Sequence, residues 1–436
     1  MLILFVLGLF LVSPFLQMIL RAINGLDNQP LVVTSGYVQY YQRTIQNIHI
    51  LARFTAILVL CWLIIYRIMC KRSGKTRTKD FQWNEFLVKL LPMFLFLLFA
   101  LSIALVTIIR GPNEYDLTGH PYMFESVYSY ISYPLVFFFC GMMLFQEKHR
   151  KILLYALLFT SLPINILALI NEWGTRILLF SDADVCGVCA VFHNSNHYGY
   201  YLAITIITAA LMSVYERITW LKVFSAVCGG IATIVLIINN TLGAYLAVLF
   251  VFVLFILYSF LLAKENKKQS LIVMGGYLFI TVVMSFRYAT ILSSFVTLFG
   301  DLGLIISDPL EADSAGSSRW MLWKGTVQHI PESPFLGFGV EGLLNPYGVG
   351  TPHNEFLQYA VFFGIQTSLL YIIACLVILY RVFKNCQKLD RTTMICFFVC
   401  IGYLASSFFG VAIYYTTPLI YIFLGMTYAE YLHISV

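Results

Sequence analysis

The chain has 436 residues, of which 60% are hydrophobic and 11% are charged, and its mean hydropathy is +0.83. A soluble domain of this length would need far more polar surface, so the composition excludes a soluble enzyme and indicates a membrane protein with several spans. The net charge of +6 does not indicate a nucleic-acid partner, because an excess of lysine and arginine also follows from the positive-inside bias of membrane proteins.

Apolar runs of about 17 to 25 residues recur along the chain, each long enough to cross a lipid bilayer as a helix. Alternating strand patterns are missing, so we predict an all-α transmembrane bundle of about twelve spans. The predicted spans are 2–20, 47–69, 86–109, 126–146, 152–171, 197–214, 221–238, 242–263, 270–287, 355–380, 394–415 and 418–433. The first run lacks a basic leader and a small-residue cleavage site, which indicates an uncleaved span.

The basic residues predict the orientation of these spans. If the N-terminus is cytoplasmic, most of the 27 lysines and arginines fall in inner turns. The outer segments then include 110–125, 172–196 and a large loop, 288–354. The inner turns leave no room for a catalytic domain, so we treat 1–436 as one membrane domain whose chemistry takes place in the membrane or on its outer face. Within the loop, we expect the apolar residues 291–306 to form an interfacial or re-entrant piece.

The large outer loop contains a predicted short helix that begins at Arg319. The serines before it, Ser317 and Ser318, are good N-cap residues, and Pro331 would end the helix. Its apolar positions recur at the spacing of an amphipathic interfacial helix: Trp320, Trp323, Val327 and Ile330. Arg319 falls in the first turn, where free N–H groups and the helix dipole favour an anion. It would therefore either bind a phosphate or extend to lipid headgroups.

A histidine stands where the tenth predicted span begins. Thr351, Pro352 and His353 are interpreted as N-cap, N1 and N2 of that helix. The positive end of a helix disfavours imidazolium and so keeps His353 neutral, as a general base requires. Ala360 and Gly364 would share its face and leave a shallow strip for a helix or a lipid chain. The alternative is a hydrogen-bonding cap without a catalytic role.

Two further patterns resemble known sites less well. GFGVEG (337–342) fits G-x-G-x-x-G, but no strand precedes it, so we interpret it as a tight outer turn and not as a dinucleotide site. The second pattern would suit a structural zinc site or a local disulfide. It consists of Cys186, Cys189, His193 and His197, with Asp182 and Asp184 nearby. The spacing is shorter than in the usual paired motifs, and we predict no metal or other cofactor at the active site. Ionisable residues inside the spans are few, which argues against a proton-coupled pump.

Four segments resemble motifs of one family. SSRWMLWKGTVQHIPESPFLGFGVEG is similar to an arginine, an apolar helix and Pro-x-x-Gly-x-Gly, and HNEFLQYAVFFG is similar to a His-Asn motif followed by glycine. Upstream, FHNSNHYGYYLAI and NNTLGAYLAVLF resemble two motifs at outer span edges. The family is that of the bacterial O-antigen ligases and polysaccharide polymerases, which are polytopic glycosyltransferases. The resemblance covers roughly residues 190 to 370.

The resemblance implies a GT-C-like fold and a metal-independent, inverting glycosyltransferase of the bacterial cytoplasmic membrane, with its active site on the extracytoplasmic side. It would pass a glycan from undecaprenyl diphosphate to a lipid-linked repeat unit, as a polymerase, or to the lipid A core, as a ligase. A chain-length regulator and a flippase of the same pathway are the implied partners. Arg319 would bind the donor diphosphate, and His353 would accept the proton of the acceptor hydroxyl. The implied substrate-binding residues are Asn354, Asn194, Asn196, His197, Asn239 and Asn240.

One motif departs from the family pattern. Many members carry Ser-Arg where this chain has Thr241 and Leu242, so a second diphosphate-binding arginine is missing. The expected replacements are Arg110, Arg176, Arg287, Lys324, or the amides of Asn239 and Asn240. Two activities stand as alternatives to a polymerase or ligase. One is a flippase or exporter that forms no glycosidic bond, and the other is a metal-dependent transferase that uses Asp182 and Asp184.

Overall fold

A computed structural model describes residues 8, 11–16, 18–19, 83–119, 125–174, 188–192, 194–308, 312–343, 351–414 and 416–434, and within these ranges it is helical without strands. The helices are α3 (Trp83–Arg110), α4 (Glu114–Thr118), α5 (Val127–Met143), α6 (Glu147–Trp173), α8 (Ser195–Tyr215), α9 (Thr219–Asn239), α10 (Leu242–Tyr258), α11 (Lys267–Arg287), α12 (Thr290–Ser307), α13 (Arg319–His329), α15 (Glu355–Phe363), α16 (Ile365–Lys384), α17 (Arg391–Ser407) and α18 (Thr417–Ile434). Short π or 3-10 turns are η1 (Ser259–Ala263), η2 (Ala312–Ser314) and η3 (Ile330–Glu332).

Seven helices of the described part are long and apolar enough to cross a membrane. They are Lys89–Arg110, Glu147–Trp173, Ser195–Tyr215, Thr219–Asn239, Leu242–Ala263, Lys267–Arg287 and Ile365–Lys384. The prediction of an all-helical, multi-pass membrane protein is therefore confirmed. The count of twelve spans and the GT-C-like arrangement stay predictions, because the span predicted at 47–69 and most of that at 2–20 lie outside the described residues.

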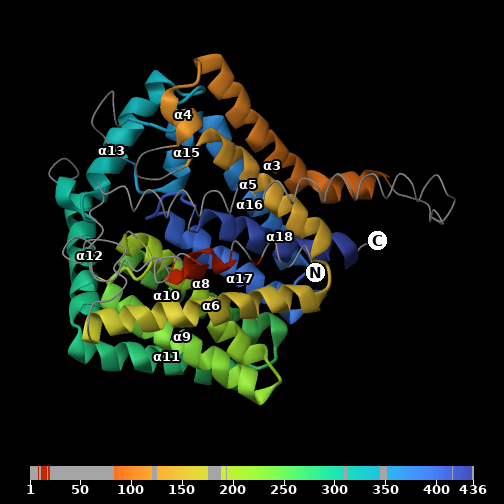
Figure 1. Ribbon diagram of the computed structural model, residues 1–436, viewed down its shortest axis with the longest axis vertical. Helices are drawn as coiled ribbons and strands as arrows, with labels where there is room; N and C mark the ends of the chain where they lie inside the picture. The colour runs from red at the N-terminus through yellow and green to blue at the C-terminus, as the bar shows by residue number, and fades with distance from the viewer. Residues whose placement is uncertain are drawn as a thin grey trace.

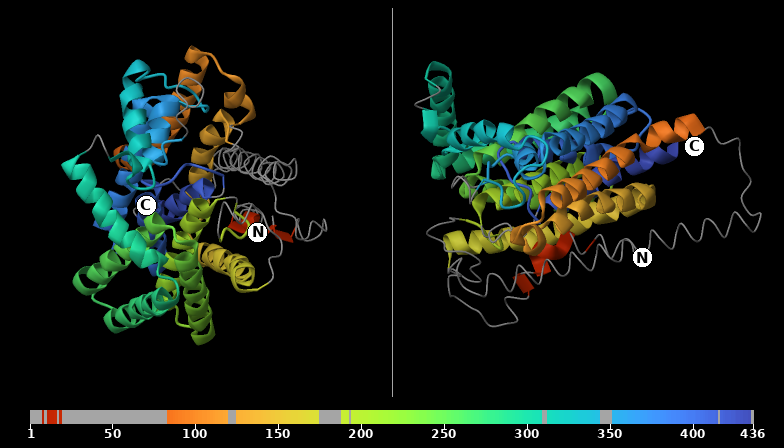
Figure 2. Two further views of the ribbon diagram at one scale, coloured as in Figure 1. Left: turned by 90° about the vertical axis from the view of Figure 1, so that its left-hand side faces the viewer. Right: turned by 90° about the horizontal axis from the view of Figure 1, so that it is seen from above.

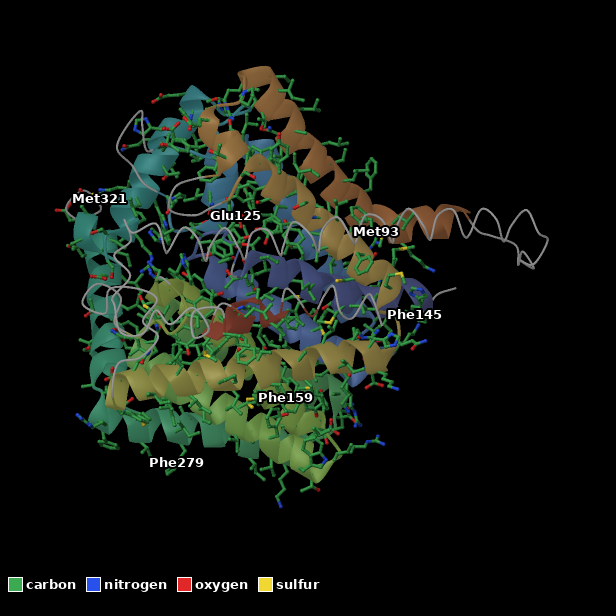
Figure 3. The ribbon with its side chains drawn as sticks, in the orientation of Figure 1. Met93, Glu125, Phe145, Phe159, Phe279 and Met321 are labelled. Carbon is green, nitrogen blue, oxygen red and sulfur yellow. The ribbon has the colours of Figure 1, made fainter. Side chains whose placement is uncertain are left out.

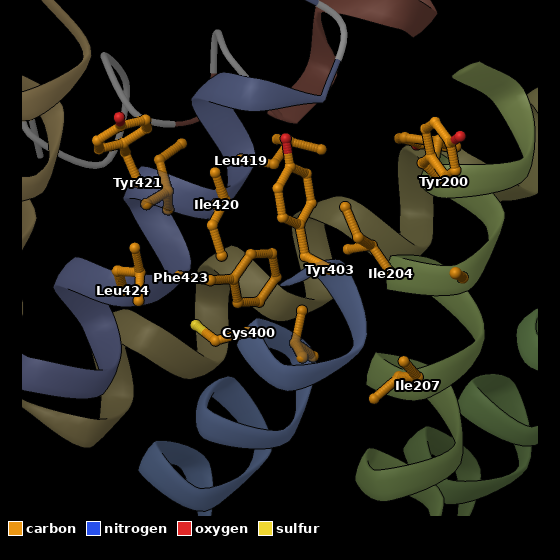
Figure 4. Close-up of a cluster of buried hydrophobic side chains, with 14 of the residues drawn as sticks. Tyr200, Ile204, Ile207, Cys400, Tyr403, Leu419, Ile420, Tyr421, Phe423 and Leu424 are labelled. Carbon is orange, nitrogen blue, oxygen red and sulfur yellow. The ribbon is translucent and has the colours of Figure 1, made fainter. Parts of the chain in front are cut away.

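Helix α8 lies at the centre of the bundle. Its spanning window is 100% buried, and it packs against α9, α10 and α17. A central helix must present apolar side chains all round, and a buried hydroxyl can bond to the helix's own backbone, as Thr205 does to the carbonyl of Tyr201 at 2.9 Å. Figure 4 shows Ile204 of α8 near Tyr403 of α17, with Phe423 of α18 on the other side of that ring.

Helix α11 lies on the outside of the bundle, where only 22% of its spanning window is buried. Its outward side chains are apolar, and Phe279 and Phe286 are 68% and 86% exposed. Figure 3 shows Phe279 pointing away from the bundle. A surface of this kind contacts lipid chains when the protein lies in a membrane.

Segments predicted to be external meet at one end of the bundle, which we call the site end. There α6 and α11 terminate beside each other, and the indole N–H of Trp173 donates to the hydroxyl of Tyr288 at 2.5 Å. The junction of α9 and α10 lies there too, because Asn240 accepts a hydrogen bond from Ser294 of α12 at 3.1 Å. These contacts join helices that are remote in sequence.

Segments predicted to be internal meet at the opposite end through ion pairs. Lys151 pairs with Glu216 at 2.8 Å, and Arg391 pairs with Glu265 at 2.7 Å. The fully buried Arg150 is held by Asp390 and by the carbonyl of Leu144. A buried guanidinium requires such partners, since an unpaired buried charge is strongly destabilising. The sorting of these segments between the two ends is the one that the predicted topology requires, and which end is cytoplasmic stays a prediction.

Helix α12 lies across the site end and not alongside the other helices. It stands at the left of Figure 1, roughly perpendicular to α6 and α11, and Figure 2 (left) shows it from the outside. It contacts α9, α10 and α11, whereas Phe299 and Ile306 on its far side are 71% and 82% exposed. The segment expected at 291–306 is thus one unbroken helix, and its orientation fits the interfacial alternative.

The tenth predicted span, 355–380, is broken into two helices, which corrects the prediction of one continuous helix. The break is at Gly364, whose φ of +87° ends α15 before α16 begins at Ile365. A Cβ at Gly364 would lie 2.3 Å from the carbonyl oxygen of Phe335. The strip predicted along Ala360 and Gly364 for a lipid or helix is therefore wrong, because the backbone of another loop occupies that place.

That loop, residues 334–340, is attached to the end of α15 by backbone hydrogen bonds. Phe338 N–H donates to the carbonyl of Val361 at 2.7 Å, and Gly339 N–H donates to that of Phe362 at 3.0 Å. Ile365 N–H in turn donates to the carbonyl of Pro334 at 2.8 Å. The loop thus satisfies carbonyl groups that a helix end leaves without partners. The glycines of GFGVEG allow this close approach, because their backbones have positive φ and a Cβ at each would lie less than 3 Å from Phe362 or Arg110. The predicted tight turn is therefore present.

We expect Gly364→Ala to lower thermal stability, because alanine would carry a strained left-handed backbone and a Cβ against Phe335. The cost should be about 1–3 kcal/mol. Fluorescence-detected size-exclusion chromatography after heating would measure it. Gly276→Ala is the matched control, since nothing lies within 4 Å of a Cβ at that position in α11. Equal melting temperatures for the two variants would contradict the packing described for the loop.

Candidate active site

The start of α13 presents Arg319 at the site end. Three consecutive residues before it, Gly316, Ser317 and Ser318, have left-handed backbones with φ of +60°, +56° and +65°. Such a run is costly outside glycine and is found where surrounding structure holds it at functional sites. Ser318 is the N-cap residue as predicted, but its side chain makes no capping hydrogen bond. The N-terminal turn of α13 therefore lacks a side-chain cap from this residue.

The guanidinium of Arg319 has only neutral partners among the described residues. One terminal nitrogen donates to the carbonyl of Gly316 at 3.2 Å, and the other donates to the side-chain oxygen of Asn196 at 3.2 Å. The buried Nε has no hydrogen-bond partner in the described structure. A guanidinium held in this way keeps its charge and an open donor for an anionic ligand.

A cavity of about 570 Å³ opens at Arg319, within the range of about 300–1,000 Å³ that is usual for small-molecule sites. Its walls come from the first turn of α8, the junction of α9 and α10, one side of α12, the start of α13 and the residues after α17. The polar and aromatic lining includes Asn196, Tyr200, Asn240, Thr241, Asp301, Arg319, Trp320 and Trp323. Three of the four predicted motifs therefore meet at one cavity, and the His-Asn motif does not line it.

His353 lies outside a helix, which corrects its predicted position at N2. Asn354 is the N-cap of α15, and its side-chain oxygen accepts from the N–H groups of Phe356 and Leu357, each at 3.0 Å. His353 has a φ of +48°, a strained conformation for this residue type. The segment is tied to α13 because the indole of Trp323 donates to the carbonyl of Pro352 at 2.9 Å.

Burial and a neighbouring charge keep His353 neutral. Removal from water lowers the pKa of its imidazole from 6.5 to about 4, and the positive charge of Arg319 lowers it further in the same direction. The two predicted catalytic residues are thus electrostatic neighbours, although His353 does not line the cavity. A neutral imidazole is the form that accepts a proton.

The other predicted substrate-binding residues are divided between the cavity and the scaffold. Asn196 and Asn240 line the cavity. Asn194 caps α8 by accepting from Asn196 N–H at 2.8 Å, and Asn239 donates to the carbonyl of Val188 at 2.7 Å. His197 and Asn354 are buried and do not line the cavity. Asparagine-rich span edges thus mark the site, but three of the five predicted asparagines form its frame.

Residues 226–372 match the family model Wzy_C, described as O-antigen ligase. This stretch of the chain is similar to the O-antigen ligase family. This match confirms the resemblance, and it includes Arg319 and His353. A comparison with curated protein sequences found no match.

Of the candidates for the second arginine, none of the described cationic side chains lines the cavity, whereas the amide of Asn240 does. Arg110 pairs with Asp116 and donates to the carbonyl of Phe362 at 3.3 Å, so it holds the loop 334–340. Lys324 pairs with Asp313 at 2.5 Å, and Arg287 lies over its neighbour's ring. Arg176 lies outside the described residues, as do Asp182, Asp184, Cys186 and His193.

The start of α10 faces the cavity where the family carries its second arginine. Thr241 and Leu242 both line the cavity, and Thr241 donates to the side-chain oxygen of Asn239 at 2.5 Å instead of capping the helix. The first N–H groups of α10 therefore have no side-chain cap, and the positive end of the helix dipole lies at the cavity. Sequence analysis missed this feature, because it depends on where Thr241 directs its hydroxyl.

We expect Arg319→Gln to raise the pKa of His353 from about 4 towards 6.5, because a positive neighbour is removed. NMR titration of histidine-labelled protein, with His353→Gln used to assign the resonance, would measure the change. The unfolded chain binds more protons than the folded chain between pH 4 and 6.5. The stability contributed by His353 is therefore complete above pH 6.5 and is lost as the pH falls towards 4. An unchanged pKa of His353 in this variant would show that the charge of Arg319 does not act on the imidazole.

Proposed function

We propose that the protein is a polysaccharide polymerase, a metal-independent inverting glycosyltransferase that acts at the outer face of the bacterial cytoplasmic membrane. It transfers a glycan from undecaprenyl diphosphate to a lipid-linked repeat unit. The observation that carries the proposal is the guanidinium of Arg319, which lines a cavity and has no acidic partner among the described residues. The family match supports a role in glycan assembly.

The donor diphosphate fits between Arg319 and the start of α10. A guanidinium forms strong, charge-assisted hydrogen bonds to phosphate oxygens. The uncapped N–H groups at Leu242 and Gly243 add donors and a positive dipole end, as in other phosphate sites at helix N-termini. This helix end takes the place of the missing second arginine, so the proposal assigns no role in the donor site to Arg110, Arg287 or Lys324.

The reaction is a single displacement. The acceptor hydroxyl oxygen forms a bond to the anomeric carbon and transfers its proton to the neutral imidazole of His353. The bond between that carbon and the diphosphate oxygen breaks, and the electron pair leaves with the diphosphate. Arg319 stabilises the negative charge that develops on this leaving group. One displacement inverts the configuration at the anomeric carbon.

His353→Ala and Arg319→Ala should each lower the yield of long-chain polysaccharide by about 100-fold or more, the usual cost of losing a general base or an electrostatic stabiliser. Gel analysis of polymer from cells that express equal amounts of each variant would measure the yield. His329→Gln and Arg217→Gln serve as matched controls, because neither residue lines the cavity. Normal chain length in the two alanine variants would refute the proposed roles.

The acceptor separates a polymerase from the second candidate, an O-antigen ligase. Purified protein should extend undecaprenyl-linked repeat units and should not glycosylate an added lipid A core. Transfer to the core alone would identify a ligase. Formation of new glycosidic bonds in detergent would exclude a flippase or exporter as the only activity, and full activity in excess chelator would exclude a metal-dependent transferase.

A further inference from the structure

Helix α12 gives the cavity a wall of mixed character. Its cavity-facing residues recur three and four positions apart, which places them on one side of the helix. They include hydroxyl residues, leucines and a single carboxylate: Ser294, Thr297, Leu298, Asp301 and Leu302. The reaction described above makes no use of that carboxylate. A charged group in a lipid-facing segment is costly unless it has a function or a partner.

Only one oxygen of Asp301 has a partner in the described structure. Its Oδ2 accepts a hydrogen bond from the N–H of Gly316 at 2.8 Å. The carbonyl of the same glycine accepts from Arg319 at 3.2 Å. Carboxylate and guanidinium therefore bond to the backbone of the same residue, Gly316, yet the described residues contain no ion pair between them. The second oxygen of Asp301 is left to accept hydrogen bonds from a ligand.

The charge of Asp301 determines which part of a ligand can lie beside it. A diphosphate is repelled by a carboxylate, whereas neutral hydroxyl groups donate strong hydrogen bonds to it. A donor molecule is thus oriented with its phosphates at Arg319 and its sugar hydroxyls at Asp301. Trp320 and Trp323 supply flat apolar surface in the same cavity, against which a sugar ring can pack.

We propose that Asp301 is a specificity-determining residue that accepts hydrogen bonds from hydroxyls of the sugar carried on the diphosphate. This inference rests on the proposed function, since it places the sugar next to the diphosphate bound by Arg319. Asp301 thereby selects among diphosphate-linked sugars by the positions of their hydroxyl groups. A donor whose hydroxyls do not reach Asp301 leaves a desolvated carboxylate without a partner, and such a mismatch is discriminated strongly.

The test uses Asp301→Asn, which keeps an oxygen for the N–H of Gly316 but offers an N–H₂ group to the cavity. Polymer formation should fall about ten- to hundredfold, the range for losing hydrogen bonds to a charged group. Undecaprenyl diphosphate without a sugar should bind this variant in nanodiscs at least as tightly as it binds the wild type, because the substitution removes a negative charge from the cavity. Asp313→Asn is the matched control, because Asp313 does not line the cavity and should leave both measurements unchanged.

Two results would overturn the proposal. If Asp301→Asn weakens the binding of undecaprenyl diphosphate as much as Arg319→Gln does, Asp301 only positions the start of α13. If polymer formation is unchanged, Asp301 does not contact the sugar. Unaltered binding of undecaprenyl diphosphate to Arg319→Gln would instead refute the donor site under the proposed function. That outcome is read from a different variant, so the two failures are distinguishable.

Discussion

The arrangement of the site end depends on backbone hydrogen bonds between the loop 334–340 and the end of α15. These bonds let the chain stop a helix at Gly364 and start another at once, without leaving polar groups unpaired in an apolar environment. Asp116 reinforces the junction, because it is fully buried and accepts from both Arg110 and the N–H of Val340. A short helix, α15, is thereby fixed with its N-terminus beside His353.

The cavity itself results from elements that cross the ends of the bundle. Helices α8 and α10 present only their N-terminal turns to it, up to Tyr200 and Leu246, while α12 and α13 lie over them. This division separates two tasks, since the packed spans give rigidity and the crossing helices carry the charged groups. Trp323 links the segments that carry Arg319 and His353 through the carbonyl of Pro352. Their relative position is therefore set by packing and by one indole hydrogen bond.

Much of the fold and part of the site could be predicted from the sequence. Hydropathy and charge determine where long apolar helices lie, and the start of α13 at Arg319 follows from its caps and breakers. The break at Gly364 was missed, because both flanking segments are apolar and the bend needs a partner loop 30 residues upstream. In the sequence, Asp301 only interrupts an apolar run, and nothing there indicates a role for its carboxylate. Its cavity-facing direction becomes apparent only once α12 is placed across the bundle.

Under the proposed function, the charges of the cavity explain how one arginine can be sufficient for a diphosphate. Arg319 is not neutralised by Asp301, because both bond to Gly316 and not to each other. An ion pair between them would have cancelled the positive field that a leaving group needs. The backbone of Gly316 lies between the two charged groups, and the uncapped start of α10 adds a second positive end. Because the positive and negative groups lie at different places in one small cavity, they orient a bound ligand as well as hold it.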